Sequence, residues 1–347
     1  MKKLLIALFS AFLLITTTAC GGGTTAEKQT LVISTWGLEE DALWSEVYEP
    51  FEKEYNCIIQ LEVGTTAERY TKLAENPNSA IDIIELSQKA AADGYVDGLF
   101  EEIDYSKIDN YEKLIPAAKA VADQGYGPAY TINSIGIVYD KEQTGFEIKT
   151  WDDLWDARLA GKISIPDIGT TFGPAMIYMA SDHAKVDIES DNGAAAFKAL
   201  EELKPNIVKT YARSADLANM FAAGEIAVAV VGDFGVPTIK NANESVEYVV
   251  PASGTYANLN TIDIVAGAAN MDLAYKYINW RISQATQSKT VAALNEAPVN
   301  TLVELTDEQK VNKTVDEVAA NAKSLNFTFV NANINDWTDK WNVTLNS

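Results

Sequence analysis

The sequence predicts an α/β fold built from two lobes. Strand-like and helix-like segments alternate between residues 31 and 99, an order that is typical of a parallel sheet covered by helices. The pattern then changes to one long extended segment over 125–140, after which the alternation resumes. A chain of 347 residues is also long enough to bury two separate cores. Together these observations favour two lobes joined by crossover strands.

The first alternating unit contains short apolar runs rich in β-branched residues, which indicate buried parallel strands. These strands are expected at 31–36, 57–63 and 81–87. Helical segments are expected after them, at 39–55, 68–76 and 89–99. In the first helix Leu43, Val47 and Phe51 recur at helical spacing, which predicts a face packed against the sheet.

The extended segment over 125–140 alternates small and apolar residues, as expected of strands that cross between two lobes. A short capped helix is expected at 150–161, followed by the strand ISIP, a polar turn and a helix beginning FGPAM. A second α/β unit continues through three segments, 197–208, 215–225 and 226–233. Return strands are expected at 246–252 and 261–268, and later helices at 272–283 and 316–325. Trp337 and Trp341 are four residues apart and predict a C-terminal helix packed on its lobe.

The N-terminus has the composition of a secretory signal. Two lysines precede an apolar run over 4–15 that is too short to span a bilayer, and small residues follow it. Residues 1–19 are therefore interpreted as a signal peptide. Cys20 stands where a bacterial lipobox places the cysteine that is diacylated, and residues 20–29 are interpreted as a lipidated, flexible tether. The alternative is ordinary cleavage that leaves Cys20 unmodified.

Composition argues against several classes of protein. The formal net charge of −22 repels nucleic acid, so no nucleic-acid partner is expected. If Cys20 carries lipid, Cys57 is the only remaining thiol, and His183 is the only histidine, so neither an internal disulfide nor a metal site is expected. The nucleotide motifs GxxxxGK[ST] and GxGxxG are absent, and no cofactor is expected.

A secreted hydrolase is the competing class. A serine triad needs a histidine base, but His183 lies outside any glycine-framed serine motif and is expected in a surface loop. A glycosidase needs two carboxylates in a cleft, which a chain with 49 acidic residues does not exclude. The hydrolase interpretation therefore stays open on composition, while no motif favours it. We expect a binding protein and not an enzyme.

Five segments carry a resemblance to a known family. They are STW (34–36), TWDDLWDARLAGKISIPD (150–167), LANMFAAGEIAVAVVGD (217–233), NEAPVN (295–300) and NDWTDKWN (335–342). In this order they resemble the bacterial extracytoplasmic solute-binding proteins of ABC importers. The branch is similar to the one that contains spermidine/putrescine-binding proteins and their iron- and phosphonate-binding relatives. The resemblance spans essentially the whole chain after the signal segment.

This resemblance implies a type II periplasmic-binding-protein-like fold, which holds a solute in the cleft between two lobes and closes about a hinge. It implies a lobe 1 at 30–131, with about 258–297 returning to it, and a lobe 2 at 132–257, with about 298–347 returning. It also implies a monomer on the extracytoplasmic side of the membrane, anchored through Cys20. The expected partners are a small-molecule solute and the membrane permease subunits of the importer.

Strand ends that face the cleft supply the first candidate ligand-binding residues. Trp36 ends the first strand, where the resemblance to polyamine binders implies an aromatic wall for the solute; the alternative is a packed core tryptophan. Ser87 ends the third strand, where its hydroxyl binds the solute or caps the following helix. Weaker candidates from similar positions are Tyr130, Ser214, Tyr256 and Asn260.

Two further strand ends belong to the second unit. The turn after ISIP carries Asp167, Thr170 and Thr171 ahead of a helix. The threonine hydroxyls and the helix N–H groups suit a carboxylate, phosphonate or phosphate, and the alternative is a plain helix cap. Asp233 ends another strand, where its carboxylate suits an ammonium group; the alternatives are a helix cap and an internal salt bridge.

The sequence supports more than one class of solute. The acidic, aromatic-rich chain favours an amine such as spermidine or putrescine. Lys89 stands where polyamine binders carry an aromatic residue, and Asn260 stands where they carry an aspartate. These departures and the GTT turn favour an anionic or zwitterionic solute, such as 2-aminoethylphosphonate or phosphate. Fe³⁺ is least favoured, because the tyrosines are scattered and histidine is nearly absent. We expect an amine-type solute.

Overall fold

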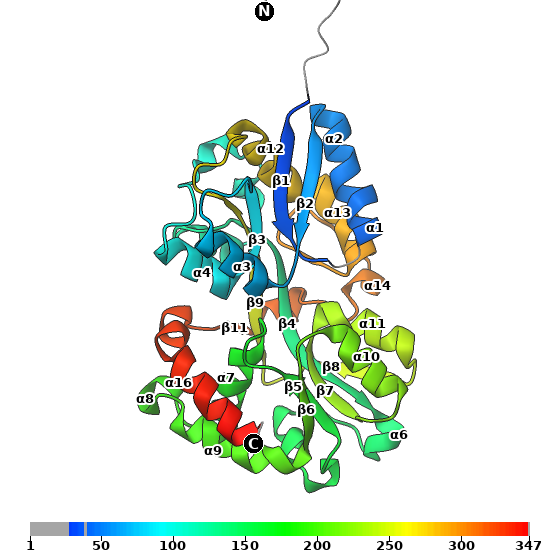
Figure 1. The fold of residues 1–347 in the computed structure, drawn as a ribbon. Coiled ribbons are helices and arrows are strands. Elements are labelled where there is room, and N and C mark those ends of the chain that lie inside the picture. Colours follow the sequence, from blue (N-terminus) through cyan, green and yellow to red (C-terminus); the bar gives the residue numbers. More distant parts are fainter. Residues whose placement is uncertain (1–27, 38–39, 346–347) are drawn as a thin grey trace, which may run out of the picture.

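The structure, a computed structural model, describes residues 28–37 and 40–345 and has two lobes, one above the other in Figure 1. The predicted signal peptide, the predicted lipid attachment at Cys20 and the expected helix start at Glu39 lie outside the described residues. Within the described ranges, no helix combines the length and the apolar character needed to cross a bilayer.

The strands of both lobes share one sheet. They are β1 (Thr30–Thr35), β2 (Ile58–Val63), β3 (Ile83–Ser87), β4 (Ala129–Asp140), β5 (Ile163–Pro166), β6 (Ile207–Tyr211), β7 (Val228–Gly232), β8 (Val246–Val249), β9 (Thr255–Ile264), β10 (Ala297–Pro298) and β11 (Ala322–Ser324).

Helices cover both lobes. In the first half of the chain they are α1 (Glu40–Leu43), η1 (Trp44–Tyr48), α2 (Glu49–Tyr55), α3 (Thr66–Glu75), α4 (Gln88–Val96), η2 (Tyr105–Lys107), η3 (Tyr111–Lys113), α5 (Pro116–Ala122), α6 (Lys141–Thr144), η4 (Trp151–Trp155) and η5 (Ala157–Leu159). In the second half they are α7 (Gly173–Ala184), α8 (Ile188–Asp191), α9 (Ala194–Leu203), η6 (Lys204–Asn206), α10 (Ser214–Ala222), η7 (Asp233–Gly235), α11 (Val236–Ala242), α12 (Met271–Arg281), α13 (Gln284–Leu294), α14 (Asp307–Lys310), α15 (Asp316–Ala320) and α16 (Phe327–Leu345).

The sheet runs in the order β2-β1-β3-β9-β4-β7-β5-β6. Its two ends are parallel, because β1 pairs in parallel with β2 and β3, and β5 pairs in parallel with β6 and β7. The middle is antiparallel, where β9 lies between β3 and β4 and β4 continues to pair with β7. Figure 1 shows β4 and β9 running from one lobe into the other. The predicted α/β architecture with crossover strands is therefore present.

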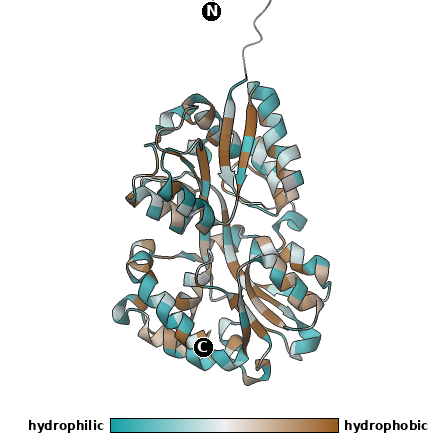
Figure 2. Ribbon diagram, in the orientation of Figure 1, coloured by the Kyte–Doolittle hydropathy of each residue, from teal (hydrophilic) through white to brown (hydrophobic). Residues whose placement is uncertain are grey.

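Each lobe has its own hydrophobic core. The upper lobe in Figure 1 buries Leu31, Ile83 and Ile262 completely, and the lower lobe does the same with Trp337 and Trp341. Figure 2 shows hydrophobic residues along the strands of both lobes and many hydrophilic residues on the helices outside them. The predicted packing of the two tryptophans of α16 onto their lobe is confirmed.

Local chemistry sets the ends of several elements. The side chains of Thr65 and Glu68 form a reciprocal capping box that starts α3. Asn56 adopts a left-handed conformation with φ of 48° and ends α2. At the start of α7 a Cβ on Gly173 would lie 2.3 Å from the carbonyl oxygen of Asp167, so the turn between β5 and α7 closes only around a glycine.

Three local expectations were wrong. The expected helix over 316–325 is helical only through α15, and the chain then forms β11, which pairs with β9. The expected capped helix over 150–161 consists of the two 3₁₀ segments η4 and η5. His183, expected in a surface loop, lies in the last turn of α7, stacked 3.9 Å from the ring of Trp155.

Candidate functional site

The carboxyl ends of the parallel strands in the two lobes bring most of the candidate residues to one region. In lobe 1, Trp36 follows β1 and Ser87 ends β3. In lobe 2, Asp167 follows β5 and Asp233 follows β7, with β6 next to β5. The ends of parallel strands share one edge of a sheet, and in open α/β folds such edges are where ligands bind. We call this region the interlobe strand ends.

One pair of opposite charges, Glu68 and Arg213, links the two sets of strand ends across the lobes. Glu68 belongs to the first turn of α3 in lobe 1, and Arg213 immediately precedes α10 in lobe 2. Hydrogen bonds from the backbone and side chain of Thr65, and then the charge of Arg213, lower the pKa of Glu68. The effect of Arg213 requires that the two charges lie near each other across the lobes.

Trp36 is half-buried against the lobe 1 core. Its Nε1 donates a hydrogen bond of 3.0 Å to Oγ1 of Thr66, and the guanidinium of Arg69 lies 4.6 Å from its ring centroid. Arg69 in turn donates to the carbonyl oxygens of Ser34 and Glu85 at the ends of β1 and β3. The orientation of the indole is therefore fixed by an edge contact and by a buried cation against its ring.

Ser87 lies beside a row of amide side chains on the crossover strands. Asn260 of β9 is opposite Ser87 of β3 in the strand register. Nδ2 of Asn258 donates to Oδ1 of Asn260 at 2.7 Å and to Oδ1 of Asn133 at 3.3 Å, and Oδ1 of Asn258 accepts from the backbone N–H of Gln88. Ser87 precedes α4 without making a side-chain cap, so the capping alternative for its hydroxyl is not observed. These neutral amides can offer both donors and acceptors to a polar solute.

The turn between β5 and α7 is held by Asp167. Its Oδ1 accepts from the backbone N–H of Gly169 at 3.0 Å, and its carbonyl oxygen accepts from the hydroxyl of Thr170 at 2.7 Å. Asp167, Thr170 and Thr171 are all half-buried. The N-cap position of α7 is Phe172, which makes no side-chain cap, so neither threonine acts as the plain helix cap that the sequence left open.

Ser214 and the short helix η7, which begins at Asp233, pack together beyond the ends of β6 and β7. A Cβ on Gly235 would lie 2.7 Å from Oγ of Ser214, so the serine packs closely against the residue two positions after Asp233. The Asp233 carboxylate is 2% exposed and accepts hydrogen bonds from the backbone N–H of Phe234 and from the backbone and hydroxyl of Thr314. Asp233 thus sits below the surface and joins β7 to the segment after α14.

Burial raises the pKa of Asp233 to about 7, although hydrogen bonds from Thr314 and Phe234 and the charge of Lys313 act in the opposite direction. A folded-state pKa above the ordinary value means that the folded protein holds a proton that the unfolded chain releases. The stability contributed by this group is therefore fully present below about pH 4 and is lost as the pH rises through about 7.

Asp233→Asn removes this titration. As the pH rises from 5 to 8, wild type is expected to lose roughly 1–2 kcal/mol of unfolding free energy that the variant does not lose. Urea denaturation of both proteins at the two pH values measures this difference. An offset between the two proteins that is the same at pH 5 and pH 8 contradicts the expectation.

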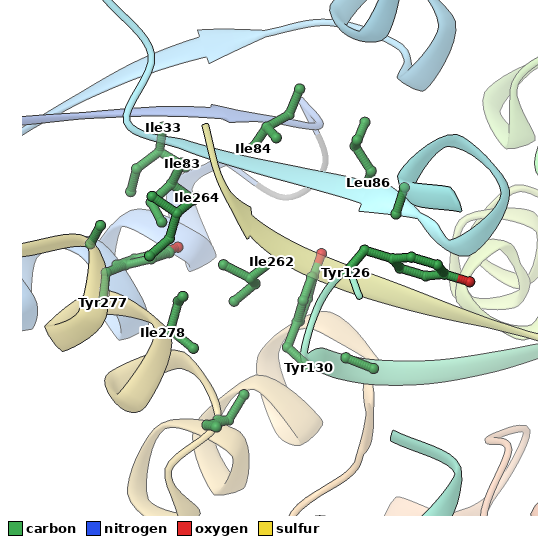
Figure 3. Close-up of a cluster of buried hydrophobic side chains, with 14 of the residues drawn as sticks. Ile33, Ile83, Ile84, Leu86, Tyr126, Tyr130, Ile262, Ile264, Tyr277 and Ile278 are labelled. Atoms are coloured by element: carbon green, nitrogen blue, oxygen red, sulfur yellow. The ribbon is translucent and has the colours of Figure 1, made fainter. Parts of the chain in front are cut away.

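Tyr130 lies in the lobe 1 core and not at the surface of the interlobe strand ends. Figure 3 shows its ring among the buried side chains of this core, with Ile262 and Tyr277 nearby. Its hydroxyl points toward Glu85, with 3.5 Å between Oη and Oε2, and the guanidinium of Arg281 lies 4.2 Å from its ring centroid. A role for Tyr130 in binding solute remains a prediction, and its observed contacts are internal.

Tyr256 lies in lobe 2, beside a cavity of about 440 Å³ that is also lined by Tyr178 and Lys323. The hydroxyl of Tyr256 donates to Oδ2 of Asp182 at 2.9 Å, and Nζ of Lys323 donates to the same oxygen at 2.8 Å. Its observed partners belong to α7 and β11 and not to the interlobe strand ends, so its predicted contact with solute is not supported by these neighbours.

Four residues of this region were missed from the sequence: Arg69, Gln88, Arg213 and Asn258. Arg213 could have been found because it directly precedes Ser214, a candidate chosen for following a strand. Asn258 is two residues from Asn260, and alternate residues of a strand share a face. Arg69 carried no local signal, because its position beneath Trp36 depends on the packing of α3.

Comparison with known proteins gives a consistent set of relatives. A family described as bacterial extracellular solute-binding protein matches residues 46–320. The spermidine/putrescine-binding periplasmic protein 1 of Haemophilus influenzae is 25% identical over 279 residues, which cover 78% of this chain and 75% of that protein. The gamma-aminobutyric acid-binding protein of Pseudomonas aeruginosa is 22% identical over 282 residues, covering 79% and 78% respectively.

A solved structure described as an ABC transporter from Clostridium perfringens has a higher identity to this chain. It is 51% identical, covers 91% of this chain and 99% of its own, and superimposes with a TM-score of 0.81.

Proposed function

The chain belongs to the family of bacterial extracellular solute-binding proteins, and on this premise we propose that it captures a small amine-type solute, of which polyamines such as spermidine and putrescine are one class, between its two lobes. It is the substrate-binding protein of an ABC transporter. Such a protein binds its solute outside the cytoplasm and works with a permease in the membrane. It is a transport protein and not an enzyme, so the hydrolase interpretation is rejected. The predicted type II, two-lobe fold is confirmed.

One observation above others supports the proposal that the solute carries an amino group. Two relatives that align over about three quarters of their own lengths are named for solutes that carry amino groups, spermidine and putrescine in one case and gamma-aminobutyric acid in the other. The interlobe strand ends of this chain offer matching chemistry. Trp36 supplies a half-buried aromatic surface for a hydrocarbon chain, and Asp167 supplies a half-buried carboxylate. Ser87, Thr170, Thr171, Ser214 and Asn260 supply polar groups around them.

Thermal unfolding in the presence of single solutes tests this proposal. Spermidine, putrescine, 4-aminobutyrate and 2-aminoethylphosphonate are compared with phosphate at equal concentration. At a hundredfold excess over Kd, a solute that binds only the folded protein adds about 2.7 kcal/mol of stability, which is a shift of several degrees in Tm. We expect such a shift with at least one amine, which is recovered chemically unchanged. A shift with phosphate alone, or conversion of the solute, contradicts the proposal.

We also propose that the mature protein is a monomer held at the membrane by lipid on Cys20. Replacement Cys20→Ser removes the thiol that would be diacylated, and two acyl chains are enough for stable anchoring. The variant is expected in the soluble extracytoplasmic fraction, while wild type sediments with membranes and its N-terminal peptide carries the mass of a diacylglyceryl group. Equal partitioning of the two proteins contradicts the lipid anchor.

A further inference from the structure

Three carboxylates at or near the interlobe strand ends, those of Asp233, Asp93 and Asp167, differ in how fully they are engaged within the protein. Asp233 is 2% exposed, and both of its oxygens accept hydrogen bonds from neighbouring residues. Asp93 of α4 binds Nζ of Lys89 at 2.8 Å and also accepts from Asn331 of α16. Asp167 is half-buried, and its Oδ2 has only a 3.3 Å contact with a threonine hydroxyl. Among these three carboxylates, Asp167 retains the most capacity to bind an ammonium group.

Positive charge in the same region is less fully engaged. Arg213 is exposed and forms no salt bridge with the residues that the structure describes. The opposite charge near it, Glu68, already accepts a hydrogen bond of 2.8 Å from the backbone N–H of Thr65. The guanidinium of Arg213 is therefore available to an anionic group that enters between the lobes.

The cation beneath Trp36 limits what that ring can bind. Arg69 is 3% exposed, lies 4.6 Å from the ring centroid, and its Nη2 has no hydrogen-bond partner in the described part of the chain. A cation is attracted to the negative face of an aromatic ring, and a cation already held on one face weakens the attraction for a second one on the other. Trp36 is therefore suited to the hydrocarbon part of a solute and poorly suited to a bare ammonium group.

Three helix starts add to this balance of charge. The helices α4, α7 and α10 follow β3, β5 and β6, and none of them has a side-chain cap. Helix N-termini carry partial positive charge that favours anions. The observation that carries the inference is the position of the exposed Arg213 near the half-buried Asp167: the backbone N–H of Asp167 donates to the carbonyl oxygen of Tyr211, two residues before Arg213. The helix starts reinforce the positive sign of this region.

We propose that the solute carries an acidic group as well as its amino group, as in an ω-amino acid or an aminophosphonate, and that Arg213 binds the acidic group while Asp167 binds the amine. This inference rests on the proposed function and names the class of solute at the same site. A polyamine, which offers only ammonium groups, leaves Arg213 without a partner and places positive charge beside it. An acid that has no amino group leaves the carboxylate of Asp167 without a partner.

Isothermal titration with solutes matched in carbon number tests the inference. One pair is 4-aminobutyrate and putrescine, with butyrate as the acid alone; the other is 2-aminoethylphosphonate and 1,2-diaminoethane. In at least one pair the acid-bearing amine is expected to bind at least about tenfold more tightly than the diamine, because one favourable ion pair replaces one repulsion. Butyrate is expected to bind more weakly than 4-aminobutyrate by a similar factor.

A matched pair of variants assigns the acidic group to its residue. Arg213→Gln is expected to weaken binding of the preferred acid-bearing solute by about tenfold. The ratio of its affinity to that of the matched diamine is expected to fall as well. The control is Arg158→Gln, because Arg158 is also exposed in lobe 2 but pairs with Asp156, and this variant is expected to bind as wild type does. Unchanged affinity in Arg213→Gln overturns the assignment.

The outcomes separate this inference from the function on which it rests. Tighter binding of putrescine or 1,2-diaminoethane than of both acid-bearing amines overturns the inference and leaves an amine-binding protein. If butyrate binds and none of the amines does, both the inference and the proposed function are overturned. The absence of binding by every solute in the titration also overturns both.

Discussion

Replacement of Arg281 by alanine is expected to lower the free energy of unfolding by about 3–5 kcal/mol, the cost of leaving a buried charge without its partner. Its side chain is 1% exposed, its Nη2 lies 2.5 Å from Oε1 of Glu296, and its Nε lies 3.9 Å from Oε1 of Glu85. Although burial lowers the pKa of Arg281, the charges of Glu296 and Glu85 outweigh that effect and raise it overall. Without the guanidinium, two carboxylates remain in the lobe 1 core beside the ring of Tyr130. Urea denaturation followed by tryptophan fluorescence measures the loss.

Arg158→Ala is the control for this prediction. Arg158 also forms a 2.5 Å ion pair, with Asp156, but its side chain is 62% exposed. An exposed pair of this kind contributes at most about 1 kcal/mol. Equal losses in the two variants, or an Arg281→Ala protein as stable as wild type, would show that the buried network does not hold lobe 1 together.

Replacement of Trp36 by alanine is expected to weaken solute binding by about thirtyfold or more, which corresponds to about 2 kcal/mol. The indole is half-buried at the end of β1, fixed by Thr66 and Arg69, and offers a rigid apolar surface at the interlobe strand ends. A rigid aromatic residue binds with little loss of conformational freedom, so truncation removes contact area that nothing else replaces. Isothermal titration with the solute that gives the largest Tm shift measures the change.

Trp44→Ala is the matched control, since Trp44 belongs to η1 and is 40% exposed. Its removal is expected to leave the affinity unchanged. Trp36→Phe keeps an aromatic ring but loses the hydrogen bond to Thr66, and it is expected to retain most of the binding. If Trp36→Ala folds and binds as tightly as wild type, Trp36 is the packed core tryptophan that was its alternative interpretation.

Strong local patterns account for the parts of the fold that the sequence predicted. The apolar runs that became β1 and β3 carry β-branched residues and are largely buried, and the pair Trp337 and Trp341 recurs at helical spacing, so burial and period agree. The edge strand β2 was also predicted, although Ile58 and Val63 in it are exposed. Segment 316–325 shows the opposite case. Its composition is helical, but Ala322–Ser324 pairs with β9, and this tertiary pairing overrides the local propensity.

The candidate site was less predictable, because side-chain direction depends on neighbours that lie far away in the sequence. Every residue of β4 is buried, so no alternation could show that Tyr130 points into the core toward Glu85. Asp233 was correctly placed at a strand end, yet its partner Thr314 is 81 residues away. The proximity of Arg213 to Glu68 depends on both lobes being in place, so no local pattern in the sequence could show it.

A crystal structure of the protein with the amine that gives the largest Tm shift tests the central claim most directly. The solute is expected between the lobes, with its hydrocarbon part against Trp36 and its amino group within hydrogen-bond distance of Asp167. A solute bound elsewhere, such as in the cavity beside Tyr178 and Tyr256, would contradict the claim that the interlobe strand ends form the binding site.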